Sequence, residues 1–184
     1  MKKLFILIAS IFLLACQSST EPEEEEQQPD NSEVVPNISL NICSNGEGQW
    51  NLYDFYGAEN GGEDHVIYLD LFASWCSICA DAAPETQEIY EDFKDQGLVV
   101  VGAGSDLNQP YSCGGWANAF NLTYPILNDE TSDNGPREMF DGSYPVSIVI
   151  GHDMKVVYKE SGRHNDTAIR TAIESALENM KNAQ

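Results

Sequence analysis

Residues 66–79 read VIYLDLFASWCSIC, and the organisation of the chain follows from this stretch. Residues 66–72 are almost continuously apolar, which predicts a central strand buried on both faces. Cys76 and Cys79 follow with two residues between them, and the residues after Cys79 favour a helix. A strand that leads directly into a helix with two cysteines in its first turn is typical of a site that forms and breaks a disulfide. The unpaired backbone N–H groups and the helix dipole stabilise a thiolate there.

The length and charge of the chain limit what it can be. Its 184 residues are enough for one domain with a hydrophobic core. It carries 30 acidic and 9 basic residues, which gives a formal net charge of −21. Nucleic acid and anionic membrane surfaces are therefore poor electrostatic partners, and no nucleic-acid partner is expected.

The first residues have the pattern of a targeting segment. Lys2 and Lys3 precede an apolar run over residues 4–14, and the run ends in Leu-Leu-Ala before Cys16. This pattern resembles a bacterial lipoprotein signal, which implies that residues 1–15 are removed and that Cys16 is lipidated. An ordinary secretory signal or an uncleaved anchor is the alternative. Each of these places the domain outside the cytoplasm, where disulfides persist.

Residues 16–36 are predicted to be an acidic, disordered tether between the lipid and the domain. They include the run EPEEEE at 21–26, in which like charges repel and proline blocks regular structure. The folded domain is then expected over residues 37–184. Gln17 stands where an aspartate would act as a retention signal, which favours the outer membrane in bacteria that have one.

Beyond the tether, strand and helix signals alternate along the chain. The predicted elements are a first strand at 38–43, a strand or short helical turn at 50–56, a loop at 57–64, the strand at 66–72, a helix at 76–96, a buried strand at 98–103, a short helix at 116–120, a strand at 144–150, an antiparallel strand at 154–158 and an amphipathic helix at 167–180. This order predicts an α/β fold, a three-layer α/β/α sandwich around a central mixed sheet.

The stretch around the cysteines resembles the active-site strand and helix start of the thioredoxin superfamily. Pro84 lies five residues after Cys79 and matches the proline that kinks the family's active-site helix. Tyr144 and Pro145 match the family's cis-proline pair, and Gly162 matches a glycine near the end of its last strand. The resemblance extends over residues 36–180 and implies a thioredoxin-like sandwich.

The inserted segment at 104–125 is similar to that of one branch of this superfamily. This branch comprises membrane-tethered, extracytoplasmic thiol-disulfide oxidoreductases with an AhpC/TSA-redoxin-like domain. The resemblance implies a monomer without a cofactor that reduces protein disulfides rather than forming them. It also implies an electron donor in the membrane or the extracytoplasmic space. Ser77 and Ile78 replace the Gly-Pro or x-Pro dipeptide that is common between the family's cysteines.

Three residues are expected to carry the redox chemistry. Cys76 is the expected nucleophile: its thiolate attacks a substrate disulfide, and Cys79 then resolves the mixed disulfide. Asp70 lies in an apolar strand, so burial should raise its pKa and let it accept the proton of Cys79. The alternatives are a structural disulfide or half of a metal site for the cysteines, and a solvated strand edge for Asp70.

Trp75 and Tyr144 are expected to bind substrate, and Pro145 is expected to be a fourth catalytic residue. Trp75 would cover one side of the thiols and offer an apolar surface to partners. A cis bond before Pro145 would expose the backbone of Tyr144 to a bound polypeptide and keep metal away from the thiols. The alternatives are ordinary packing for Trp75 and a trans proline at the start of a strand.

Cys43 and Cys113 remain once the other cysteines are assigned. They form either a structural disulfide between the first strand and the inserted segment, or two separate buried thiols. Other pairings among the four cysteines stay open at this point.

Two other functions are alternatives to thiol-disulfide oxidoreductase activity. A peroxidase of the same fold needs a Thr-x-x-Cys arrangement, and Ala73 stands at that position. A copper or zinc carrier could use the thiolates of Cys76 and Cys79, which suit copper(I), but it would need a dedicated histidine. No metal site is expected.

Overall fold

The computed structural model describes residues 33–130 and 135–183. The expected signal peptide, the lipidation of Cys16 and residues 17–32 of the expected tether lie outside the described residues. Within the described part of the chain, no helix combines the length and the apolar character needed to cross a bilayer.

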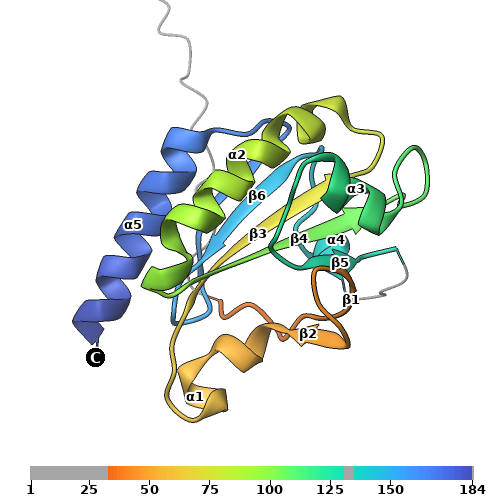
Figure 1. Ribbon diagram of the computed structural model, residues 1–184. Coiled ribbons are helices and arrows are strands. Elements are labelled where there is room, and N and C mark those ends of the chain that lie inside the picture. The colour runs from red at the N-terminus through yellow and green to blue at the C-terminus, as the bar shows by residue number, and fades with distance from the viewer. Residues whose placement is uncertain (1–32, 131–134, 184) are drawn as a thin grey trace, which may run out of the picture.

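A seven-stranded mixed sheet forms the centre of the domain (Figure 1). Its strands follow the order β2-β1-β5-β4-β3-β6-β7. Their bounds are β1 Ser39–Ser44, β2 Gln49–Asn51, β3 Val66–Ala73, β4 Leu98–Ser105, β5 Ile126–Asn128, β6 Val146–Ile150 and β7 Val156–Ser161. The central strand β3 pairs in parallel with β4 and antiparallel with β6, and all eight of its residues are buried. Burial on both faces explains why this strand is an unbroken apolar run rather than an alternating one.

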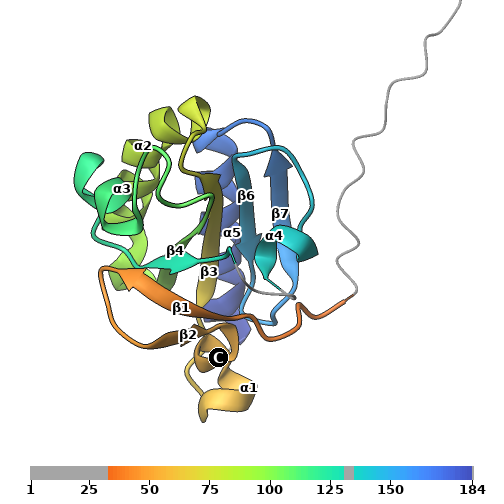
Figure 2. The same cartoon turned by 90° about the vertical axis from the view of Figure 1, so that its right-hand side faces the viewer.

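Helices of very different length accompany the sheet. The α-helices are α1 Gly57–Asn60, α2 Ser77–Phe93, α3 Cys113–Ala119, α4 Pro136–Met139 and α5 Asp166–Ala183, and two 3-10 turns are η1 Leu52–Phe55 and η2 Lys94–Gln96. The long helices α2 and α5 lie side by side over β3, β4, β6 and β7, as both views show (Figure 2).

The core has two halves, one on each face of the sheet. On one face, residues of β3 such as Phe72 pack against Trp116 of α3 and Ile173 of α5. On the other face, Leu71 packs with Leu52 of η1 and Phe140, which follows α4. Helical layers therefore lie on both sides of a mixed sheet, and the predicted three-layer α/β fold class is confirmed.

The expected tether ends earlier than predicted. It was expected to extend to residue 36, but Val34 pairs with Lys155, and the buried Val35 donates its N–H to the Met154 carbonyl oxygen at 2.7 Å.

The other local predictions hold except in two segments. The segment expected as a loop at 57–64 contains the single-turn helix α1, because Asp64 Oδ1 accepts a hydrogen bond from the Gly57 N–H at 2.8 Å and closes the segment. The helix expected to reach residue 96 changes to a 3-10 turn after Phe93. Gly97 then ends it in the left-handed region, with φ 98°, where glycine is favoured.

Candidate active site

The two cysteines of the Cys-x-x-Cys pair lie where β3 ends and α2 begins. Cys76 is the N-cap of α2, and its Sγ accepts a hydrogen bond from the Cys79 N–H at 3.1 Å. Helical geometry brings residues three apart to one side, so Cys76 and Cys79 reach each other and are joined in a disulfide with a Cα–Cα distance of 5.2 Å. Both side chains are buried, with 6% and 3% of their surface exposed.

The start of α2 is electrostatically suited to a thiolate. The first backbone N–H groups of a helix have no partner within the helix, and they point at the N-cap side chain. The first turn of α2 contains no acidic residue, so no carboxylate there opposes the positive end of the helix dipole. A reduced Cys76 is therefore held in a place that stabilises its anionic form.

Trp75 and Tyr144 lie together beside the cysteines. The Trp75 side chain is 60% exposed, and its ring meets that of Tyr144 edge to face, with the centroids 6.3 Å apart. The Tyr144–Pro145 peptide bond is cis. The Tyr144 hydroxyl donates a hydrogen bond to Ser105 Oγ at 3.0 Å, which links this turn to the end of β4. Residues from the ends of β3 and β4 and from the start of β6 are thereby brought together.

The structure adds an apolar residue that the sequence did not single out. Among the described residues, four large hydrophobic side chains are exposed, and two of them, Trp75 and Ile78, directly precede Cys76 and Cys79 in the chain. Ile78 lies between the two cysteines and is 49% exposed. An apolar residue in a helix position that faces solvent is the signal that could have identified it.

A loop after β4 is fastened to the same end of the sheet. Trp75 Nε1 donates a hydrogen bond to Asp106 Oδ2 at 2.8 Å, which fixes the exposed indole. Ser74 Oγ donates to the carbonyl oxygens of Asp106 and Gln109, the latter at 2.7 Å. Asp106 and Ser74 are further residues of the site that sequence reasoning missed, because their contacts join segments more than 30 residues apart.

Asp70 lies in the core rather than at a solvated edge. It is 5% exposed and sits on the face of β3 that α2 covers, two residues from Tyr68 and from Phe72 on that face. Burial raises the pKa of Asp70 to about 7, and the hydroxyl of Thr86 on α2 opposes this rise. A carboxyl group with such a pKa can both take and release a proton near neutral pH.

Cys43 and Cys113 are joined in a second disulfide, with a Cα–Cα distance of 5.9 Å. It connects β1 to the first residue of α3. Next to it, Trp116 of α3 stacks on Phe72 of β3, with the ring centroids 4.4 Å apart. The disulfide and this stacked pair hold the inserted segment against the sheet.

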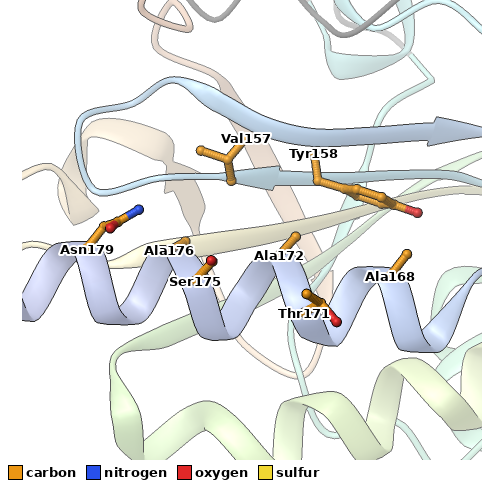
Figure 3. A pocket seen from close by; sticks show the side chains of 8 residues that line it. All are labelled: Val157, Tyr158, Ala168, Thr171, Ala172, Ser175, Ala176 and Asn179. Carbon is orange, nitrogen blue, oxygen red and sulfur yellow. The ribbon is translucent and has the colours of Figure 1, made fainter. Parts of the chain in front are cut away.

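A separate hollow of about 480 Å³ lies between β7 and α5 (Figure 3). Figure 3 shows small side chains of α5, such as Ala168 and Ala172, opposite Val157 and Tyr158 of β7. It shares no residue with the cysteine site. In the described part of the chain, no group of three or more histidine, cysteine or acidic side chains is arranged to hold a metal ion.

Comparison with known proteins gives similarities over most of the domain. The model of the AhpC/TSA family matches residues 32–159. The thiol-disulfide oxidoreductase ResA of Bacillus cereus (strain ZK / E33L) is 26% identical over 97 residues, which is 52% of this chain and 54% of that protein. The match thus spans about half the length of this curated relative.

Two solved structures share the fold. A putative thiol:disulfide interchange protein DsbE from Chlorobium tepidum is 23% identical with a TM-score of 0.67, covering 80% of this chain and 98% of that one. The pneumococcal exposed lipoprotein thioredoxin Etrx1 from Streptococcus pneumoniae strain TIGR4 is 25% identical with a TM-score of 0.58, covering 76% and 98%. The thioredoxin-like fold expected from the sequence is confirmed.

Proposed function

The chain belongs to the AhpC/TSA family, and from this membership and the geometry of Cys76 and Cys79 we propose that it is a thiol-disulfide oxidoreductase that acts on proteins. The observation that carries the proposal is the position of the pair. The two sulfurs are bonded to each other at the start of a long helix, beside exposed apolar side chains, and the buried Asp70 lies on the strand face that this helix covers. The curated relative named ResA supports the same activity.

The first step of the proposed reaction uses Cys76. Its thiolate attacks one sulfur of a substrate disulfide, a bond forms between Cys76 and that sulfur, and the substrate's other sulfur leaves as a thiolate that takes a proton from water. The helix start stabilises the attacking anion, and the side chain is buried until a substrate engages it.

The second step uses Cys79 and Asp70. The Cys79 thiol gives its proton to the Asp70 carboxylate, and the resulting thiolate attacks Cys76. The mixed disulfide breaks, the substrate's second sulfur leaves as a thiolate that takes a proton from water, and the Cys76–Cys79 disulfide forms. Two electrons have passed to the substrate, and a dithiol donor restores the protein. Asp70 then releases its proton, which its pKa of about 7 permits near neutral pH.

The substrate surface in this proposal consists of Trp75, Ile78 and the turn at Tyr144 and Pro145. The exposed Trp75 indole, the partly exposed Tyr144 ring and Ile78 offer an apolar contact, and the backbone of Tyr144 offers pairing to an extended polypeptide. Asp106 holds the indole of Trp75 in place for this contact. A surface of this kind suits an unfolded or flexible protein segment that contains a disulfide.

The direction and location of the reaction are part of the same proposal. We place the protein outside the cytoplasm, anchored by a lipid on Cys16, where it reduces disulfides with electrons from a membrane or extracytoplasmic donor. The similar pneumococcal protein supports the location, because it is an exposed lipoprotein. Attachment to the outer membrane stays a prediction from Gln17 alone.

Insulin reduction by dithiothreitol tests the proposed activity. We expect the protein to accelerate insulin precipitation, and we expect Cys76→Ser to lower the rate to that of dithiothreitol alone. The double variant Cys43→Ala/Cys113→Ala is the matched control, because it also removes a disulfide but leaves the proposed nucleophile. Full activity in Cys76→Ser would end the proposal.

A further inference from the structure

Thr86 is a buried residue of α2 whose hydroxyl is not used by its own helix. Its side chain has 0% exposure, and Oγ1 has no hydrogen-bond partner among the described residues. A threonine inside a helix often donates to the carbonyl oxygen four residues earlier. Thr171 does so in α5, where its Oγ1 donates to the Thr167 carbonyl oxygen at 2.8 Å. Thr86 therefore holds a free donor in the core.

Asp70 holds the complementary free acceptor. Its Oδ1 is buried and also lacks a hydrogen-bond partner within the described part of the chain. The Thr86 hydroxyl nevertheless lies close enough to the carboxyl group to act on its pKa. The Thr86 hydroxyl on α2 and the Asp70 carboxyl group on β3 thus lie near each other, and neither Thr86 Oγ1 nor Asp70 Oδ1 has a hydrogen-bond partner among the described residues. A buried hydroxyl and a buried carboxyl oxygen that stay without hydrogen bonds destabilise the folded protein. A small side-chain rotation that forms a hydrogen bond between Thr86 Oγ1 and Asp70 Oδ1 is therefore favourable.

Three other hydroxyls lie near Asp70, those of Ser147, Tyr68 and Tyr124. Ser147 lies directly opposite Asp70 in the β3–β6 pairing, and its Oγ lies 3.3 Å from the Tyr68 hydroxyl. Burial raises the pKa of Tyr68 and of Tyr124 well above the usual value, so both stay neutral at neutral pH. Cys79 does not titrate in the disulfide. The Thr86 hydroxyl acts on the pKa of Tyr68 as well as on that of Asp70, so it lies beside both groups. Of these hydroxyls, that of Thr86 is the one that is buried without a hydrogen-bond partner among the described residues.

We propose that Thr86 is a positioning residue for Asp70: its hydroxyl donates to the carboxylate and holds it ready for the proton of Cys79. This inference rests on the proposed oxidoreductase function. Cys79 and Thr86 are seven residues apart, about two helical turns, and both belong to the buried face of α2. In the resolving step the S–H bond of Cys79 breaks, Asp70 takes the proton, and the S–S bond to Cys76 forms. Thr86 supplies a hydrogen bond and exchanges neither proton nor electron.

A carboxyl titration of the oxidised full chain tests the proposal. The oxidised form is used because Cys76 and Cys79 then do not titrate, and Asp70→Asn identifies the Asp70 signal in the ¹³C NMR spectrum. We expect Thr86→Val, which removes the hydroxyl at nearly constant volume, to raise the pKa of Asp70 by about one pH unit. Thr86→Ser keeps a hydroxyl and should titrate within about 0.3 units of the wild type.

Two further variants make the test specific. Thr171→Val removes the same hydroxyl from α5 and should leave the Asp70 titration unchanged. Thr86→Ala is a second way to remove the hydroxyl, and it should shift the titration in the same direction as Thr86→Val. We also expect the acidic limb of the insulin-reduction pH profile to move up by about one unit in Thr86→Val.

The results separate this role from the proposed function. An unchanged Asp70 titration in Thr86→Val and Thr86→Ala, or an equal shift in Thr171→Val, would overturn the role of Thr86 while Cys76-dependent activity remained. Full insulin reduction by Cys76→Ser would overturn the proposed function instead, whatever the titration showed.

Discussion

The disulfide between Cys76 and Cys79 closes a ring within the first turn of α2, whereas that between Cys43 and Cys113 joins β1 to α3 across 70 residues. Both pairs have a cysteine at the start of a helix. Only the first pair adjoins exposed apolar side chains and a helix face that packs over a buried acid. A helix start therefore does not distinguish the two pairs by itself; the surroundings of the sulfurs do.

The two regions should also differ in what they contribute to stability. The long-range disulfide restricts the unfolded chain, and this restriction grows with the length of the closed loop. The short ring restricts the unfolded chain very little. Asp70, in the same region as the short ring, is expected to lower stability at neutral pH, because its charge is buried. The predictions below test this contrast, from the largest expected effect to the smallest.

The largest difference is expected when the resolving cysteine is removed. Cys79→Ser should attack substrate through Cys76 and then stop, so a covalent complex with a disulfide substrate accumulates and turnover is lost. Mass spectrometry under non-reducing conditions measures the complex. The double variant Cys43→Ala/Cys113→Ala should accumulate none and keep activity within about twofold when folded. Loss of activity in the folded double variant would show that the Cys43–Cys113 pair is also needed for turnover, and that the two pairs do not differ as proposed.

The next effect concerns stability. Removing the long-range disulfide in Cys43→Ala/Cys113→Ala should lower the free energy of unfolding by about 4 kcal/mol, the chain-entropy value for a loop of this length. Urea unfolding of the oxidised protein measures it. Cys76→Ala/Cys79→Ala is the control, and its loss should be clearly smaller. Equal losses would show that loop length does not govern the contribution of either disulfide.

The buried acid gives a pH dependence with a definite sign. The pKa of Asp70 is raised by burial to about 7 in the folded protein, against 3.8 as its usual value. The folded state therefore binds this proton more tightly than the unfolded state, so its contribution to stability is present below pH 4 and is lost as the pH rises to 7. Asp70→Asn removes this loss.

We expect the stability of Asp70→Asn relative to the wild type to increase by on the order of 3 kcal/mol between pH 4 and pH 8. Urea unfolding at both pH values measures this increase. Asp141→Asn, which changes an exposed carboxylate, is the control measured alongside it. A wild type that lost no stability relative to Asp70→Asn over this range would show that Asp70 is not buried as a neutral acid.

The smallest effect is expected at the substrate surface. Trp75→Ala should raise the KM for insulin by several-fold and change the free energy of unfolding by less than about 1 kcal/mol, because the indole is mostly exposed. Val157→Ala removes another exposed hydrophobic side chain far along the sheet and should leave KM unchanged. Equal KM values for the two variants would remove Trp75 from the proposed surface.

Much of the fold could be predicted because its signals are local. The apolar run that forms β3, the helix after Cys79 and the amphipathic pattern of α5 all appear as periodicity in the sequence. The buried position of Asp70 also follows locally, because it interrupts an apolar run. The single-turn helix α1 could not be predicted, because Asp64 closes it from outside the helix.

The candidate site was only partly accessible to sequence reasoning. Cys76, Cys79 and Trp75 are contiguous in the chain, so their spacing identifies them. Asp106 and Thr86 are not marked by any local pattern: one approaches the indole from the loop after β4, and the other faces Asp70 from two turns along α2. Side-chain neighbours of this kind depend on which strands and helices pack together.

The sequence by itself determined the fold class, the cysteine pair and the apolar strand that holds the acid, because each is a property of residues adjacent in the chain. Only the tertiary structure decided that Cys43 lies next to Cys113, that Asp106 holds Trp75 and that Thr86 faces Asp70. The periodicity of apolar residues indicates which face of a helix or strand is buried, but it does not indicate which residues pack against that face. The order of strands in the sheet and the position of each helix on it settle those contacts.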